Sequence, residues 1–204
     1  VISKQIYDLE IALAPVLRMM EETGIAIDKV FFKKLSDQFA KSLKKLEISI
    51  TKKAGVAFNI NSPKQLSEVL FGNLELSAKG LHKTPGGVIS TASSELEKLK
   101  EKNPIVEEVL KYREVAKLQN TYVTPLPRLA DRKSRVHTHF DQLGAATGRL
   151  SSSNPNLQNI PLQGEWGKEI REGFVAKKGF ELVSLDYSQV ELRIASHIAK
   201  EERM

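Results

Sequence analysis

The sequence predicts an α+β fold that is mainly helical at the front and mixed α/β at the back. Residues 3–23 and 29–54 each repeat apolar positions every three or four residues, which is typical of amphipathic helices. Residues 135–142 alternate in polarity, and 180–185 form a short, mostly apolar run, and both patterns favour strands. At 204 residues, the chain can bury a core and form one or two domains.

Composition excludes several classes of protein. The hydrophobic content is 41%, no run of 18 apolar residues occurs and the chain does not open on a signal peptide, so neither a membrane span nor secretion is supported. The absence of Cys excludes disulfides and thiolate metal sites, which fits a reducing cytoplasm. We therefore expect a cytoplasmic protein without a membrane partner.

The formal net charge of +6 is concentrated in one segment. Between Lys29 and Ala54, eight Lys face only Asp37 and Glu47, so the remainder of the chain is formally neutral. A concentrated basic stripe favours a polyanion as partner. A solvated helix face explains the charge equally well.

The first helix, 3–23, is expected to face the core. Its apolar positions are Ile6, Leu9, Leu13, Val16, Leu17 and Met20. Gly24 can end this helix in the left-handed conformation, and 25–27 form a brief extended link. Asp28 can then cap the second helix.

The second helix, 29–54, has a sustained apolar face. That face comprises Phe31, Leu35, Phe39, Leu43, Leu46 and Ile50. Roughly 25 residues at 1.5 Å each span nearly 40 Å, so the helix could lie along several base pairs. Gly55 ends it, and Ser62 followed by Pro63 begins another.

The middle of the chain predicts a loop between short helices. Residues 72–90 are rich in Gly and predict a mobile loop, but they lack the Gly-Lys-Ser/Thr spacing of a phosphate-binding P-loop. A short helix follows to about residue 102, and Asn103 with Pro104 starts the next, which we expect Pro125 and Pro127 to end. His137 and His139 share one face of the following strand, but no third metal ligand is evident nearby.

The stretch 182–193 places one acid, Asp186, where a buried strand is expected to turn into a helix. Ser188 and Glu191 match the ends of a capping box, in which Glu191 would accept from the backbone N–H of Ser188. Metal and phosphate chemistry is commonly assembled at such junctions. An acid at this place can also be only a turn or cap residue.

Three stretches resemble family A DNA polymerases, the DNA polymerase I group. LDYSQVELR (185–193) resembles the first palm motif of this family, and TGRLSSSNPNLQNIP (147–161) resembles the loop just before the palm. YREVAKLQNTYVTPLP (112–127) resembles the tip of the thumb helices. The resemblance implies a palm-associated leading helix (1–28), a thumb (29–130) and the first part of a mixed α/β palm with antiparallel strands (131–204).

The resemblance also implies roles at the first palm motif. Phosphoryl transfer from a nucleoside triphosphate depends on charge neutralisation, which two Mg²⁺ ions with oxygen ligands can supply. Asp186 would bridge the two metals and the Tyr187 carbonyl would join the coordination. Tyr187, Ser188, Gln189 and Glu191 would line the incoming dNTP, with Glu191 closing the space near the sugar 2′ position. We expect Arg193, on the same helix, to form a structural ion pair.

Eight side chains are expected to contact primer-template DNA. By resemblance, Arg149 contacts the primer end and Gln158 and Asn159 the nearby duplex, where donors can meet minor-groove acceptors common to all base pairs. Asn156 offers a further donor in the same loop, although all these short polar residues could be simple turn formers. Phosphate contacts are expected from Arg113, Lys117, Asn120 and Thr121, for which a solvated helix end is the alternative.

Departures from the family pattern indicate an incomplete enzyme. Nothing resembles the fingers helix with its Arg, Lys and Tyr, or the His-Asp-Glu stretch that carries the second metal-binding Asp. Gln163 stands where the family often has Arg, and Trp166 replaces a common aliphatic residue. Since the chain begins with Val1 and stops inside a helical pattern at Met204, we expect a piece of a longer polypeptide, inactive alone, that needs the remaining C-terminal polymerase portion.

Three functions follow as hypotheses. The first is one half of a split or cleaved DNA polymerase, acting in a bacterial nucleoid or in viral replication in a host cell, with an organelle as a further option. The second is a non-catalytic DNA-binding module, against which the presence of Asp186 and Glu191 argues. The third, a metal-dependent nuclease or other hydrolase, ranks last because such sites need clustered carboxylates.

Overall fold

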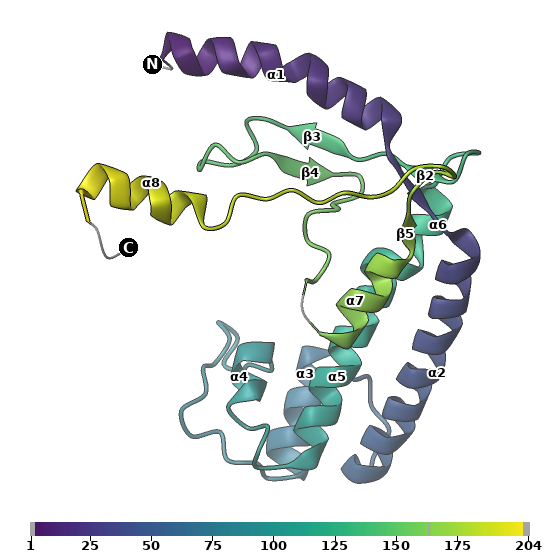
Figure 1. Cartoon of the computed structure of the whole chain (residues 1–204). Helices are drawn as coiled ribbons and strands as arrows, with labels where there is room; N and C mark the ends of the chain where they lie inside the picture. Colours follow the sequence, from purple (N-terminus) through teal and green to yellow (C-terminus); the bar gives the residue numbers. More distant parts are fainter. Residues whose placement is uncertain (1–2, 163, 202–204) are drawn as a thin grey trace.

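A computed structural model of the chain describes residues 3–162 and 164–201 (Figure 1). Its helices are α1 (Lys4–Thr23), α2 (Lys29–Ala54), α3 (Pro63–Ser67), α4 (Ser93–Glu97), α5 (Pro104–Leu118), α6 (Pro125–Leu129), α7 (Glu165–Glu172) and α8 (Val190–Ala199), with π-helical turns η1 (Glu68–Asn73) and η2 (Gln119–Val123). Its strands are β1 (Ile25–Ile27), β2 (Arg135–Val136), β3 (His139–Asp141), β4 (Ser151–Ser153) and β5 (Phe174–Val175). The predicted α+β class is confirmed.

Helix α2 is the long support of the fold, and its predicted ends are confirmed. One carboxylate oxygen of Asp28 accepts from the backbone N–H groups of Val30 and Phe31 at 2.9 Å, which satisfies donors that the first turn leaves free. Gly55 ends the helix in the left-handed conformation with φ of 70°, and its N–H donates to the carbonyl of Thr51. The helix packs lengthwise on α5 (Figure 1).

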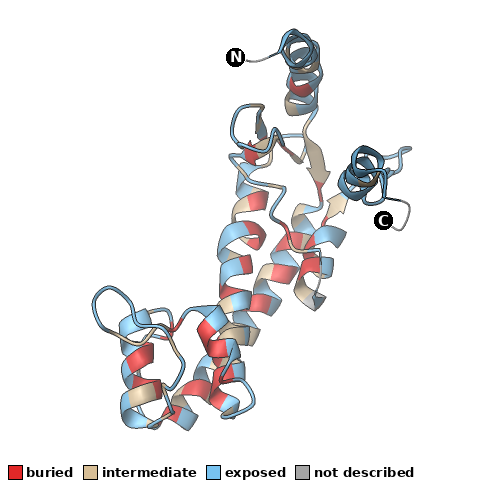
Figure 2. Cartoon of the chain, turned by 90° about the vertical axis from the view of Figure 1, so that its left-hand side faces the viewer, coloured by how far each residue is buried: buried red, intermediate tan, exposed pale blue. Residues whose placement is uncertain are grey.

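Two hydrophobic cores lie along this helix pair, and Figure 2 shows their buried residues as separate groups. The first surrounds Phe32 and Phe39 of α2 and joins η2, α6, α7 and the sheet. The second surrounds Ile50 at the other end of α2 and joins α3, η1, α4 and the start of α5. Because one rigid helix contributes to both cores, it fixes the distance between the sheet region and the α3–α4 region.

Helix α5 does not end at the prolines as the sequence predicts. It ends at Leu118, the chain continues through the π-helical turn η2, and Pro125 begins α6. The prediction was wrong because the first helical turn needs no intrahelical N–H, so a proline can start a helix as readily as stop one. The predicted start is confirmed, since the Asn103 side chain accepts from the backbone N–H of Ile105 at 3.0 Å.

The predicted strand 135–142 is two strands in two sheets. β2 pairs antiparallel with β1, which also pairs with β5, whereas β3 pairs antiparallel with β4. The break falls at Thr138, whose buried hydroxyl donates to the carbonyls of Ser153 and Pro155 at 3.1 and 2.7 Å. Gly24 allows the close approach of β1, because its φ is 61° and a Cβ there would lie 2.6 Å from the Val136 carbonyl oxygen.

Helix α1 is not core-facing as predicted. Among its residues only Leu17 is buried, and Leu9, for example, is 63% exposed. The helix projects over β3 (Figure 1) and is held there by polar contacts from Glu21, whose carboxylate accepts from the backbone N–H of Phe140 and pairs with His139. The apolar residues of α1 therefore form a face suited to burial, and no described part of the chain covers that face.

The strand expected over 180–185 is also unpaired. The chain from 176 to 189 has no regular secondary structure, and Leu185 is 92% exposed. A strand requires a hydrogen-bonding neighbour, and no described strand pairs with this segment. Within residues 3–162 and 164–201, no helix has both the length and the apolar character needed to cross a membrane.

Candidate functional site

Asp186 lies exposed in the segment that leads into α8. The helix begins at Val190, and Gln189 before it has the left-handed conformation with φ of 51° and makes no side-chain cap. The predicted capping box is therefore wrong, because Gln189 turns the chain between Ser188 and Glu191. Ser188 instead accepts, through its carbonyl, a 2.9 Å hydrogen bond from Nε of Arg193, so the ion pair predicted for Arg193 is also replaced by a backbone contact.

An ion pair joins the two motifs through residues that are 42 positions apart in the sequence. The Nη2 atom of Arg149 lies 2.5 Å from Oε1 of Glu191, and both side chains are mostly exposed. The backbone N–H of Glu191 itself, and then Arg149, hold the pKa of the Glu191 carboxyl below its ordinary value. The loop 147–161 is thereby linked to the start of α8. The sequence could not predict this contact, because neither motif indicates how far apart the two segments lie in space.

We expect Arg149→Gln to raise the pKa of Glu191 part of the way toward 4.5, its ordinary value. The rise is partial because the backbone N–H of Glu191, the largest cause, remains. A lowered pKa in the folded state means that the contribution to stability is present above 4.5 and is lost as pH falls through the folded value. An NMR titration of the Glu191 carboxyl measures it.

The control for this titration is Arg132→Gln, which removes the same charge from another exposed arginine. It should leave the Glu191 pKa where it is in the unmodified chain. An unchanged pKa in Arg149→Gln would contradict the pairing.

In the loop, the polar side chains divide between shaping the backbone and facing solvent. The side-chain oxygen Oδ1 of Asn156 accepts from the backbone N–H groups of Gln158 and Asn159 at 3.0 and 3.2 Å, so Asn156 acts as a turn former. The Gln158 amide donates to the Leu150 carbonyl at 3.2 Å. All three side chains remain exposed, and their DNA contacts stay predictions.

At the end of α5 the four predicted phosphate-binding residues are not equivalent. The guanidinium of Arg113 donates to the carbonyl and hydroxyl of Thr91, and burial lowers its pKa. Lys117, Asn120 and Thr121 are exposed, with the last two on the π-helical turn η2. Arg113 therefore ties α5 to the segment before α4, whereas the other three face solvent.

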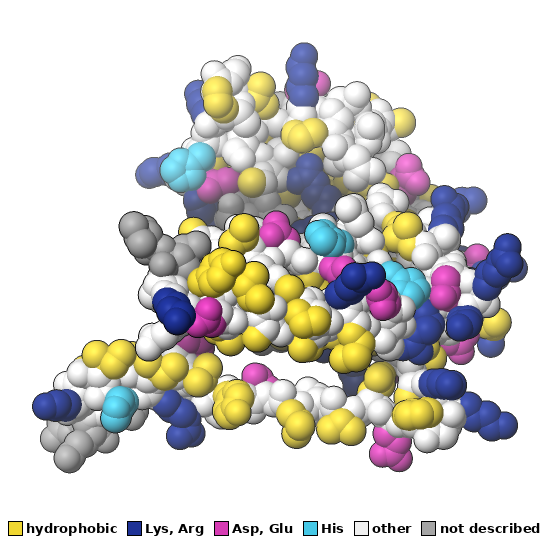
Figure 3. All heavy atoms as spheres, turned by 90° about the horizontal axis from the view of Figure 1, so that it is seen from above, with side chains coloured by type: hydrophobic (Ala, Val, Ile, Leu, Met, Phe, Trp, Pro, Cys, Tyr) yellow, Lys and Arg dark blue, Asp and Glu magenta, His cyan; other side chains and the backbone are white. Residues whose placement is uncertain are grey.

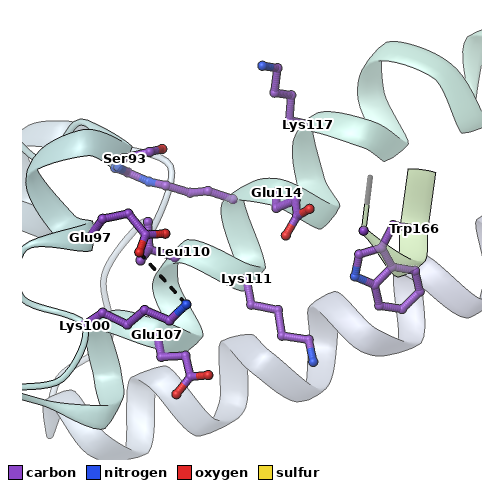
Figure 4. A pocket seen from close by; sticks show the side chains of 11 residues that line it. Ser93, Glu97, Lys100, Glu107, Leu110, Lys111, Glu114, Lys117 and Trp166 are labelled. Carbon is purple, nitrogen blue, oxygen red and sulfur yellow. Dashed lines mark ion pairs between the residues drawn. The ribbon is translucent and has the colours of Figure 1, made fainter. Parts of the chain in front are cut away.

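A hollow of about 670 Å³ lies beside Arg113, between α4, α5 and the start of α7 (Figure 4). Its lining carries both signs of charge: Glu97, Lys100, Glu107, Lys111, Glu114 and Lys117. This mixture does not select an anion. Trp166, at one end of the hollow, packs edge-on against Phe39 with ring centroids 4.8 Å apart, and this contact explains why an aromatic residue stands at that position. Gln163 lies outside the described residues.

Comparison with known proteins shows the family to which the chain belongs. The family model described as DNA polymerase family A matches residues 29–204. The chain belongs to DNA polymerase family A. The thermostable DNA polymerase I of Thermus thermophilus is 48% identical over 97% of the chain, and DNA polymerase I of Chloroflexus aurantiacus is 46% identical over 97%.

The chain spans 24% and 21% of the lengths of these two relatives. A solved structure, described as the POL domain of Pol1 from M. smegmatis in complex with DNA primer-template and dNTP, has a TM-score of 0.83 at 37% identity. That likeness covers 95% of this chain and 34% of the solved one. The chain thus corresponds to a part of a longer family A protein.

The oxygen donors of this family A chain are of the type that binds Mg²⁺, but they are too few to form a complete site. The Asp186 carboxylate and Tyr187 carbonyl are ligands of the type that Mg²⁺ prefers. Across the part of the chain that the structure describes, no three His, Cys, Asp or Glu side chains are grouped so as to hold a metal. His137 and His139 take other partners, since their Nδ1 atoms lie 2.8 and 2.9 Å from the carbonyl and carboxylate oxygens of Glu21.

Proposed function

We propose that the chain forms the thumb (29–130) and the first part of the palm (131–204) of a DNA polymerase that extends a primer with dNTPs, with 1–28 as a palm-associated helix. Membership of family A carries this proposal. The M. smegmatis structure supports it further, because its described ligands are a primer-template and a dNTP. The fold is compatible with two subdomains, since α3 and α4 lie at the end of the molecule away from the strands, with α2 and α5 running between them (Figure 1).

Asp186 is proposed as the one metal-binding carboxylate of this chain. Its exposure leaves the carboxylate free to take an ion, and the Tyr187 carbonyl follows it directly. When bound, two Mg²⁺ ions would neutralise charge on the transferring phosphate. The second Asp is proposed to come from the remaining polymerase portion.

Glu191 and Arg149 are proposed to act as one unit at the incoming nucleotide, with Tyr187, Ser188 and Gln189 lining the same place. The ion pair holds the Glu191 carboxylate in one position, where it would exclude a ribose 2′ hydroxyl. Arg149 would contact the primer end while it remains paired with Glu191.

The primer-template duplex is proposed to contact two groups of exposed polar side chains. Gln158 and Asn159 would meet the minor groove near the primer end, where their donors suit acceptors common to all base pairs. Lys117, Asn120 and Thr121 would meet phosphates farther along. Arg113 and Asn156 would support these contacts through Thr91 and through the loop backbone.

The remaining C-terminal polymerase portion is proposed to cover the apolar surface that this chain exposes. Figure 3 shows hydrophobic side chains gathered along α1 and along the C-terminal segment. In the latter, Leu185 is 92% exposed and Ile198 on α8 is 75% exposed. Apolar patches of this kind are normally buried in an interface, and an added strand would also satisfy the unpaired backbone of 180–185.

The test is reconstitution. We expect the chain alone to bind primer-template DNA weakly and to incorporate no nucleotide, because it carries one of the two metal-binding carboxylates. Addition of the C-terminal polymerase portion should restore primer extension, measured as single-nucleotide incorporation with Mg²⁺ and dNTP.

The control is the C-terminal portion without the chain, which should also be inactive. Incorporation by the pure 204-residue chain, or a mixture that stays inactive although the two parts associate, would overturn the proposal.

A further inference from the structure

Six lysines on α2 make no ion pair or hydrogen bond with another described side chain. They are Lys33, Lys34, Lys41, Lys44, Lys45 and Lys52, all exposed, and together we call them the α2 lysine stripe. The other two lysines of the helix are used structurally. Lys29 donates to the carbonyls of Ala130 and Asp131 at 3.2 and 3.0 Å, and Lys53 pairs with Glu108 at 2.9 Å.

The stripe lies on the side of α2 opposite its core. At 100° per residue, Lys34, Lys41, Lys45 and Lys52 fall on one face, and the buried residues fall on the other. Those buried residues are Phe32, Leu35, Phe39, Ile50 and Ala54. At 1.5 Å per residue, the line from Lys34 to Lys52 is about 27 Å long.

The stripe also lies away from the surface proposed for the primer-template. In Figure 1, α2 forms one edge of the molecule, with α8 and the β3–β4 pair toward the other edge and α5 between them. The buried face of α2 packs on α5, so its lysines point outward from the opposite side. The stripe therefore faces away from α5, the helix that carries Lys117.

Helix stability explains only part of the stripe, namely Lys52 in the last turn and Lys41 four residues after Asp37. Lys41 and Lys45 are four residues apart, and like charges at this spacing destabilise a helix, whereas an acid at either position would stabilise it. None of the six lysines forms an ion pair with another described residue, and Asp37 is the one acid among the exposed residues on that face. Solvated surfaces that serve only solubility usually intersperse both signs.

We propose that the α2 lysine stripe binds the phosphate backbone of a second stretch of nucleic acid, separate from the primer-template at the polymerase site. A duplex carries one negative charge per 1.7 Å of its axis, so a straight line of about 27 Å would follow roughly eight base pairs. Lysines act as point charges toward phosphates without reading sequence. A line of positively charged lysines is complementary to the regularly spaced negative phosphates of a nucleic acid.

The test compares two four-lysine variants of the chain. The first changes Lys34, Lys41, Lys45 and Lys52 to Gln, and the control changes Lys64, Lys79, Lys102 and Lys168 to Gln, which removes the same charge from dispersed exposed positions. Gln has nearly the helix propensity of Lys, so both variants should fold, and circular dichroism checks this. The probe is a 12-base-pair blunt duplex, which has no recessed 3′ end and no template overhang, titrated by calorimetry at several salt concentrations.

We expect the stripe variant to bind the duplex about tenfold more weakly at low salt, and the slope of log K against log salt to fall by about 3.6, since each of the four lost contacts removes about 0.9. The control should change much less. Equal affinities and slopes in the two variants would overturn the proposal. Poly-glutamate that binds as tightly as the duplex would also overturn it, because the stripe would then take any polyanion.

Discussion

Replacement of Asp186 by Asn is expected to lower nucleotide incorporation by the reconstituted polymerase at least about a thousandfold, because a metal ligand contributes several kcal/mol of transition-state stabilisation and each 1.36 kcal/mol is a factor of ten. Asn keeps the shape of the side chain and removes its charge. The exposed position of Asp186 means that the fold should not change. Single-turnover incorporation at saturating DNA and dNTP measures the effect.

The matched control for this variant is Glu181→Gln, which removes one negative charge from the same exposed segment five residues earlier. It should retain most of the activity, and both variants should bind primer-template DNA as the unmodified chain does. If Asp186→Asn left every activity intact, the chain would act as a non-catalytic DNA-binding module. If both variants lost activity equally, the charge of the segment, and not a metal ligand, would be the cause.

The helix ends could be predicted because their signals are local. Asp28, Gly55 and Asn103 act within one turn of their own positions, and each performs in the structure the capping role that its residue type indicates. Family membership could also be predicted, since the motifs at 147–161 and 185–193 are long and specific, and the family match over 29–204 confirms it.

Burial could not be predicted, because it depends on neighbours far along the chain or outside it. Helix α1 and the segment 180–185 have the apolar patterns of buried elements, but the described residues give them little to pack against. The capping box at Ser188 failed for a related reason. Gln189, in the left-handed conformation, begins the helix in place of Ser188, and the Glu191 carboxylate meets its own backbone N–H and Arg149, 42 residues earlier.

Phe39→Ala is expected to destabilise the chain by about 3–5 kcal/mol, the usual loss when a buried Phe is truncated in a core that cannot collapse onto the cavity. The Phe39 side chain is fully buried and contacts Trp166 edge-on, so its loss removes an aromatic pair between α2 and α7 as well as apolar burial. Because α2 contributes to both cores, the damage should reach the whole helix pair. Urea unfolding followed by circular dichroism measures the change in free energy.

The control is Phe180→Ala, the same truncation at a side chain that is 69% exposed and lies over the ammonium of Lys177. In the chain alone it should change the free energy of unfolding by less than about 0.5 kcal/mol. A loss at Phe180 as large as that at Phe39 would mean that the segment 180–185 packs against this chain after all. In the presence of the C-terminal polymerase portion, by contrast, Phe180→Ala should weaken the association of the two parts, because the proposed strand would then be buried between them.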